Sequence, residues 1–239
     1  MSSIFYLNGQ FVSENEAKIS ILDLGFVRGY GVFDFLRTYQ GKPFKLDEHL
    51  KRLESSAKQI GLQIPLISQI REIVLQTLKK NPLPEAGVKI VVSGGESYDG
   101  MTPTGKSTLA IIVKPLISYP KDFYQNGIKV ITVDLARELP EVKSTNYILA
   151  IIAKDLAKNK GAVEALYQNS LGEILEGTQT NFFGFKGKTL VASEEGILKG
   201  ITREIVLEIA EKEFPIELRP IKNSELKTFN EAFITSTTK

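Results

Sequence analysis

The chain has 239 residues, a formal net charge of +2, no cysteine and one histidine. The lack of cysteine excludes a disulfide scaffold and thiolate metal sites, and the single histidine makes a histidine-based metal centre or a Ser-His-Asp triad hard to build. No dense Lys/Arg run indicates a nucleic-acid-binding face, and no apolar run reaches the roughly eighteen residues of a membrane span. We therefore expect a cytoplasmic protein with small-molecule partners, without a metal ion, nucleic acid or membrane.

The first half of the chain is predicted to form a hairpin followed by further strands and helices. Asn8 and Gly9 separate two apolar runs, and this dipeptide favours a type I′ turn. After Asp47 the apolar residues recur three and four positions apart until Gly61, which is typical of an amphipathic helix. The predicted elements are a hairpin at 4–12, a strand at 32–39, helices at 47–60 and from Pro65 to before Asn81, and strands at 88–95 and 107–115.

Residues 100–107, GMTPTGKS, fit the P-loop pattern G-x-x-x-x-G-K-[ST] letter for letter. A P-loop needs a helix that begins at its Lys-Ser end, because the helix N-terminus and the loop N–H groups bind the phosphates. The residues that follow, 107–115, are apolar and β-branched, and they predict a buried strand. We therefore interpret residues 94–106 as a long connection and a candidate substrate-facing loop, and keep a P-loop nucleotide-binding protein as a remote alternative.

Residues 114–122 contain two prolines and little periodicity, which suits a crossing between two α+β units. We place the domains at residues 1–116 and 117–239, and expect no alternating βαβ pattern. The elements predicted for the second domain are a strand at 127–134, a helix at 146–160, strands at 164–169, 173–185 and 189–193, a helix that starts near Thr202, and strands at 215–221 and 231–238.

Three stretches of the second domain contain candidate functional residues. Glu176 and Gly177 interrupt a strand-like run, and polar residues follow them where a core strand continues apolar. Thr202 is a plausible N-cap of a helix whose N–H groups favour an anion. Lys143 follows a turn that contains a proline. Each feature has an ordinary explanation as well: a solvated glutamate in a bulge, a simple helix cap, and a surface lysine.

Four separated motifs in this domain agree with one another in order and spacing. They are Lys143 in VKSTNY, Glu176-Gly177 in LEGTQTNFF, ILKGITR from Ile197, and the terminal EAFITSTT. Together they resemble the class IV aminotransferases, the pyridoxal-phosphate enzymes of fold type IV. NGQFV, LDLGFVRGYGVFDFLR and FKLDEHLKRL are similar to the N-terminal domain of that family. The resemblance implies a homodimer with a small N-terminal α+β domain, a larger β-rich α+β domain, and the cofactor in the cleft between them.

The resemblance also assigns the contacts of pyridoxal 5'-phosphate. Lys143 would form the Schiff base with the cofactor aldehyde and move the substrate proton, and Glu176 would pair with the pyridine nitrogen. Tyr147 would hydrogen-bond the phenolic oxygen. The phosphate would be bound by Arg52, the N–H groups of Ile201 and Thr202, and Thr237. We interpret His49, by its angle from the apolar face of its helix, as a boundary residue with no catalytic role.

The implied substrates are an amino acid and a 2-oxo acid, with Arg28, Phe33 and Thr238 assigned to bind them. The implied activity is an amino-acid aminotransferase, and aminodeoxychorismate lyase is the alternative within the fold. Arg28 stands where many relatives carry an uncharged residue, and residues 94–106 lack the Arg-x-His carboxylate trap of D-amino-acid aminotransferases. Relatives usually continue beyond the STT segment, so we expect the C-terminal domain to be truncated at Lys239. L or D specificity stays open.

Overall fold

The computed structural model describes residues 3–238, and these form two compact units. The first unit contains the chain up to Ile117 together with Val142–Asn146. The second contains Ser118–Glu141 and the chain from Tyr147 onward. The segment around Lys143 is therefore packed with the first unit although it lies far along the sequence.

The first unit is built on an antiparallel sheet of six strands in the order β2-β1-β6-β5-β3-β4. The predicted hairpin is confirmed, with φ of 46° at Asn8 and 98° at Gly9, as a turn of this kind requires. The strands are β1 (Ile4–Leu7), β2 (Gln10–Ser13), β3 (Gly31–Tyr39), β4 (Lys42–Pro43), β5 (Ala86–Ser93) and β6 (Thr108–Pro115).

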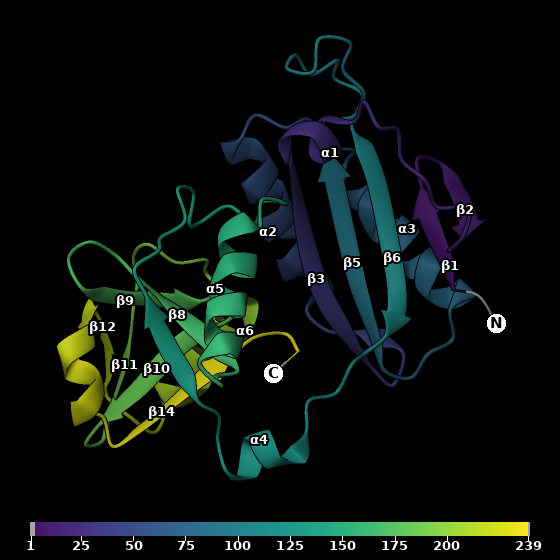
Figure 1. Ribbon diagram of the computed structural model, residues 1–239. Coiled ribbons are helices and arrows are strands. Elements are labelled where there is room, and N and C mark those ends of the chain that lie inside the picture. Colours follow the sequence, from purple (N-terminus) through teal and green to yellow (C-terminus); the bar gives the residue numbers. More distant parts are fainter. Residues whose placement is uncertain (1–2, 239) are drawn as a thin grey trace. The chain divides into compact units, whose positions relative to one another are not determined.

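Two helices cover one face of this sheet (Figure 1), namely α2 (Leu46–Gln59) on β3 and α3 (Ile67–Lys80) on β1 and β6. Both helices are confirmed predictions. Leu50 and Leu53 of α2 are fully buried against the strand residue Leu36. Burial of each such leucine stabilises the fold by about 1.5–3 kcal/mol.

The short helix α1 (Leu24–Arg28) is not predicted by the sequence, because five residues are too few to show a helical period. Asp23 initiates it: its side chain accepts a hydrogen bond of 2.7 Å from the Gly25 N–H and thereby caps the first turn. Gly29 ends it in the left-handed conformation. Arg28 is the last helical residue.

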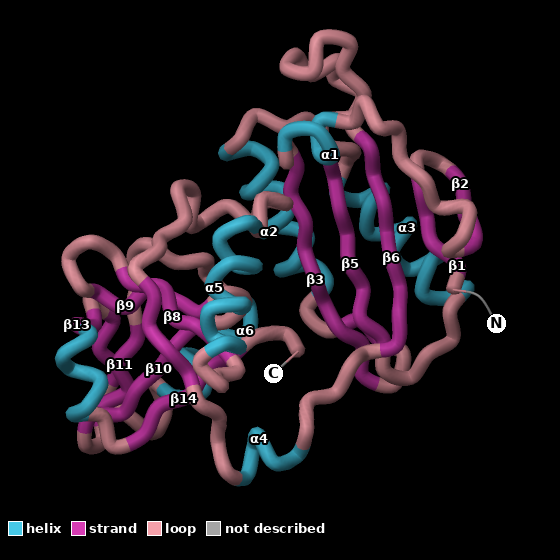
Figure 2. The backbone as a smooth tube through the Cα atoms, in the orientation of Figure 1, coloured by secondary structure: helices cyan, strands magenta, loops and turns pink. Residues whose placement is uncertain are grey.

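The connection between β5 and β6 is a long loop (Figure 2), and β6 follows it where a P-loop needs a helix. The interpretation of GMTPTGKS as part of an interstrand connection is confirmed. At the base of the loop, Gly95 has φ of +71°, and a Cβ added there would overlap the carbonyl oxygen of Lys106. Leu24 N–H donates to the Gly95 carbonyl at 2.9 Å, so the base of the loop is bound to α1.

The second unit contains an eight-stranded sheet in the order β12-β11-β10-β9-β8-β7, with β13 paired to β9 and β14 to β10. Its strands are β7 (Val130–Val133), β8 (Glu164–Gln168), β9 (Glu173–Gly177), β10 (Asn181–Lys186), β11 (Thr189–Ala192), β12 (Ile216–Leu218), β13 (Ile221–Lys222) and β14 (Glu231–Thr235). Its helices are α4 (Lys121–Gln125), α5 (Ile148–Asn159), α6 (Ile201–Ala210) and the 3₁₀ helix η1 (Asn223–Thr228). Two neighbouring pairs, β7·β8 and β11·β12, are parallel and are joined through α5 and α6.

Two strand predictions in this unit are wrong in the same way. Residues 173–185 form β9 and β10 and not one strand, because the chain turns back after Gly177, whose N–H donates to the Thr180 carbonyl at 2.7 Å. Residues 215–221 likewise contain two short strands, β12 and β13. Polar residues within a strand-like run therefore indicate a turn here. None of the helices in residues 3–238 combines the length and apolar character needed to cross a bilayer.

Replacing Gly95 with alanine tests the base of the β5–β6 loop. Gly95→Ala is expected to lower the free energy of unfolding by more than the roughly 1–2 kcal/mol that a left-handed non-glycine residue costs, because its Cβ also overlaps Lys106. Gly61→Ala is the matched control, since Gly61 has φ of +69° and nothing within 4 Å of an added Cβ. Urea unfolding measures both variants, and equal losses would show that the overlap is unimportant.

Candidate active site

Lys143 lies against the free edge of β3, in its first half. The Phe33 N–H donates to the Lys143 carbonyl and the Thr145 N–H donates to the Gly31 carbonyl, both at 2.9 Å. Ser144 forms a β-bridge with Val32 between these bonds. The Lys143 N–H donates at 3.1 Å to the hydroxyl of Ser56 on α2. Backbone bonds therefore fix the position of this lysine.

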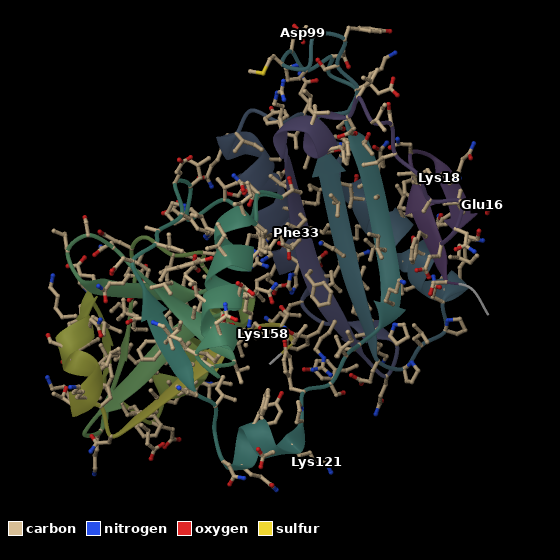
Figure 3. All side chains as sticks on the ribbon, in the orientation of Figure 1. Glu16, Lys18, Phe33, Asp99, Lys121 and Lys158 are labelled. Atoms are coloured by element: carbon tan, nitrogen blue, oxygen red, sulfur yellow. The ribbon has the colours of Figure 1, made fainter. Side chains whose placement is uncertain are left out.

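The Lys143 side chain lies over the ring of Phe33, which is labelled on β3 in Figure 3. The ammonium nitrogen is 4.7 Å from the ring centroid, and that of Lys89 on β5 is 4.8 Å from the same centroid. Cations at such distances are attracted to the ring face. Burial lowers the pKa of Lys89. Phe33, predicted to bind substrate, is 8% exposed and lies directly beside the predicted Schiff-base lysine.

Arg52, predicted to bind phosphate, projects from α2 and makes two bonds to the carboxylate of Asp34 on β3. Its Nε donates at 2.9 Å to Oδ2 and a terminal nitrogen donates at 2.8 Å to Oδ1. His49 Nδ1 lies 2.7 Å from the same Oδ1. Burial by itself raises the pKa of Asp34, but the Arg52 charge and the bonds from His49 and Arg52 outweigh it and lower the pKa to about 2.

The assignment of His49 as a boundary residue is wrong, because His49 is only 1% exposed and faces Asp34, which is wholly buried. The angle of a side chain around its helix does not show that a sheet covers that angle. The Asp34 side chain was also missed by the sequence reasoning. Its signal was present, because the two-residue period of β3 places Asp34 on the same face as Val32 and Leu36, which are core residues.

Glu176 lies in a row of three polar residues across the sheet of the second unit. Asn181 on β10 pairs with Glu176 on β9 and with Thr235 on β14. Glu176 is 5% exposed; its Oε1 accepts from Arg137 Nε at 2.9 Å and its Oε2 accepts from the Leu198 N–H at 2.9 Å. The alternative of a solvated glutamate is therefore wrong.

Two neighbours of Glu176, Arg137 and Tyr167, were not found from the sequence. Between the pairs Leu166–Gly177 and Gln168–Ile174, β8 contributes only Tyr167 and β9 contributes two residues, Leu175 and Glu176. This bulge places Tyr167 opposite Glu176. Burial raises the pKa of Tyr167 to about 12, with Arg137 opposing and Glu176 adding to the shift. The Tyr167 hydroxyl is buried and makes no hydrogen bond within residues 3–238.

The N-terminus of α6 is attached to the same row. Asn181 Nδ2 donates to the Leu198 carbonyl at 2.8 Å, and Gly200 packs so closely on Asn181 that a Cβ would overlap its Oδ1. The expectation that Thr202 caps the helix is wrong, because Gly200 is the N-cap and Ile201 is the first helical residue. In the part of the chain that the structure describes, the N–H groups of Ile201 and Thr202 have no hydrogen-bond partner.

The remaining predicted residues are more dispersed. Thr237 and Thr238 follow β14 directly, and the Thr238 N–H donates to the Ser236 hydroxyl at 3.3 Å. Tyr147 occupies the N-cap position of α5. Arg28 is exposed, and its Nε lies 3.3 Å from the sulfur of Met101 in the β5–β6 loop. Figure 3 labels Asp99 in the same loop, whose carboxylate accepts the Thr102 N–H at 2.7 Å.

Comparisons with known proteins agree on one family. The family model described as Amino-transferase class IV matches residues 31–239. A Methanocaldococcus jannaschii protein, whose name proposes a branched-chain-amino-acid aminotransferase, is 38% identical over 97% of this chain and 83% of its own length. D-alanine aminotransferase of Staphylococcus haemolyticus is 32% identical over 99% of this chain and 86% of its own length.

Solved structures are similar over the whole chain. Branched-chain aminotransferase from Thermoproteus uzoniensis, solved with norvaline, superposes with a TM-score of 0.92 at 30% identity, over 100% of this chain and 84% of that one. A second branched-chain amino acid aminotransferase, from T.th. and complexed with N-(5'-phosphopyridoxyl)-L-glutamate, gives 0.91 at 27% identity, over 100% and 83%. This chain belongs to the class IV aminotransferase family. It is an aminotransferase of fold type IV, a class of enzyme whose cofactor is pyridoxal 5'-phosphate.

The side chains described above suit this cofactor chemically. A buried carboxylate suits a protonated ring nitrogen, and an arginine and a helix N-terminus suit a phosphate. The buried hydroxyls of Tyr167, Thr180 and Thr235 have no hydrogen-bond partner within residues 3–238, and all three lie on strands or turns adjoining Glu176 or Asn181. Buried polar atoms of this kind normally have partners, so this part of the second unit is equipped to bind a polar group.

The pair Arg137–Glu176 is tested by removing one partner or both. Arg137→Met is expected to lower the free energy of unfolding by about 3 kcal/mol, because a buried carboxylate loses its counter-ion. The double variant Arg137→Met/Glu176→Met is expected to recover most of this loss. Arg219→Met, which removes a more exposed ion pair with Glu225, is the control and is expected to cost less than about 1 kcal/mol. Urea unfolding that shows no recovery in the double variant would contradict the interpretation.

Proposed function

We propose that Lys143 is the residue that binds the cofactor covalently and transfers the α-proton of the substrate. The observation that carries this proposal is the position of Lys143, which is fixed by backbone bonds at the edge of β3 and lies over Phe33. A lysine near an aromatic ring and partly removed from water can lose its proton more easily than an exposed one. Lys143 then accepts the substrate proton at Nζ and returns it to the product.

We propose further roles for the remaining residues predicted to contact the cofactor. Pyridoxal phosphate supplies an electron sink for the negative charge that forms when Cα loses its proton. Glu176, buried and hydrogen-bonded, keeps a proton on the ring nitrogen, and Tyr147 donates to the phenolic oxygen. The phosphate is bound by Arg52, the N–H groups of Ile201 and Thr202, and Thr237. Support comes from the burial of Glu176 and from the two N–H groups at the start of α6.

We propose that the preferred substrates are branched-chain L-amino acids. The support is the 38% identical relative and the Thermoproteus uzoniensis structure, both with branched-chain names. D-alanine is the second candidate, because relatives with that name are 31–33% identical. The loop of residues 94–106 contains neither arginine nor histidine, so the carboxylate trap expected of a D-amino-acid enzyme is missing. Arg28, Phe33 and Thr238 are the residues that we assign to the substrate.

Borohydride labelling tests the proposed function. Reduction is expected to fix the cofactor on Lys143, and prior incubation with L-leucine without a 2-oxo acid is expected to abolish the label, because transfer of the amino group releases the lysine. D-alanine is expected to remove the label about tenfold more slowly. Lys89, beside the same ring, is the internal control and should stay unlabelled in peptide maps. A label on another lysine contradicts the assignment, and turnover of aminodeoxychorismate alone, with pyruvate released, would favour the lyase.

We propose that the chain forms a homodimer through α5. This helix buries the small side chains of Ala150, Ala153 and Ala157 and exposes larger ones, which reverses the usual pattern. The exposed residues form a stripe of Ile148, Ile151, Ile152 and Leu156, with exposures of 65%, 68%, 47% and 41%. Exposed apolar patches of this kind mark interaction sites, and a second copy of the same chain is the commonest partner. The cytoplasmic location stays a prediction.

Ile151→Glu tests the proposed dimer. A charge in the centre of the apolar stripe is expected to shift the chain to monomers, because the carboxylate loses its water without gaining a partner. Ile209→Glu is the control, since Ile209 on α6 is also 60% exposed but lies outside the stripe. Sedimentation velocity at several concentrations measures both. A monomeric unsubstituted chain, or equal effects of the two changes, contradicts the proposal.

A further inference from the structure

Asp34 is a charged residue in the central part of β3, on the core face of the sheet. It is completely buried, and its two oxygens accept bonds from Arg52 and lie next to His49. Replacing a buried ion pair with apolar residues of similar volume often does not reduce stability. A requirement for stability alone therefore gives no reason for this arrangement.

The bonds to Asp34 determine how the Arg52 guanidinium is oriented. The group is planar, and two of its nitrogens are bound to the two oxygens of one carboxylate. A guanidinium bound in this bidentate way cannot rotate about its terminal bonds, so its remaining N–H directions are fixed as well. His49, on the same helix one turn earlier, is bound to the carboxylate and restricts its rotation in turn. The Arg52 side chain keeps 14% of its surface exposed, whereas Asp34 has none.

The same elements also position Lys143. One face of α2 contains His49, Arg52 and Ser56, and Ser56 accepts the Lys143 N–H. On β3, the residue next to Asp34 is Phe33, whose N–H donates to the Lys143 carbonyl. A fixed cation and the predicted Schiff-base lysine are thus referred to the same strand and the same helix. A ligand with an aldehyde and an anionic group separated by a few bonds matches this pairing.

We propose that Asp34 and His49 are positioning residues that orient the Arg52 guanidinium toward the phosphate group of the cofactor. The proposal rests on the proposed function of Lys143 and Arg52, and goes beyond it by assigning a role to two residues that do not themselves touch the cofactor. Asp34 and His49 act on the phosphate only through Arg52. The aldehyde and the ring are bound elsewhere, so the proposal predicts a loss of affinity that is confined to ligands with a phosphate.

Pyridoxal phosphate and pyridoxal, which lacks the phosphate, separate the two possibilities. Titration calorimetry of the full chain, freed of cofactor, measures the Kd of each. Asp34→Asn and His49→Leu are expected to weaken pyridoxal phosphate about tenfold or more and to change the Kd of pyridoxal by less than about twofold. His49→Gln retains a donor at this position and is expected to lose less affinity than His49→Leu. These two histidine variants carry the test if Asp34→Asn does not fold, as judged by circular dichroism.

Asp47→Asn is the matched control, because Asp47 on α2 also accepts from an arginine, Arg71, at 2.9 Å but at an exposed position. It is expected to leave both affinities unchanged. Equal weakening of pyridoxal phosphate and pyridoxal, or no weakening of either, overturns the proposal, and so does a tighter complex with pyridoxal phosphate. If these results occur while borohydride still labels Lys143, only the positioning role is wrong. If the unsubstituted chain binds neither ligand, the proposed function is overturned as well.

Discussion

The pairing of residues 143–145 with the free edge of β3 is the constraint on which the first unit depends. β3 has one face in the core, with Val32 and Leu36 fully buried, and its opposite face contains Phe33. Its edge remains available along the first half of the strand, and the chain returns to it more than a hundred residues later. Since the bonds involve backbone groups, they fix the Lys143 backbone whatever its side chain does. The ammonium then has only its own rotamers to explore above the Phe33 ring.

Local chemistry made part of the fold predictable. The Asn8-Gly9 turn, α2 and α3 each follow from a short-range rule about positive φ or helical period, and each was predicted correctly. The turn after Gly177 was not predicted, because residues 173–185 are rich in β-branched and aromatic residues on both sides of it. Its cause is a backbone bond to Thr180, which a residue pattern does not show. The pairing of β3 with residues near Lys143 is also invisible to any local pattern.

The candidate site shows the same division. Lys143 and Glu176 are recognisable within motifs, but their partners are single charged residues in stretches without a period, as Arg137 is. Asp34 is the exception that sequence reasoning could have found, since an acidic residue at a core position of a strand requires a buried cation nearby. His49 was misplaced because a helical angle does not tell which other element covers that angle. Partners across elements require the fold to be known first.

Each of the two charged groups proposed to bind the cofactor is already paired with an opposite charge from its own unit. Asp34 neutralises Arg52 in the first unit, and Arg137 neutralises Glu176 in the second. Removing a bare charge from water costs several kcal/mol, and here that cost is met when each unit folds. A ligand that binds such a group has only to add to an existing hydrogen-bond network whose directions are set. Because the groups need little reorganisation, their electrostatic effect on a bound ligand is larger than that of the same residues on a mobile surface. The counter-ions therefore belong to the chemistry of the site as much as the groups that they orient.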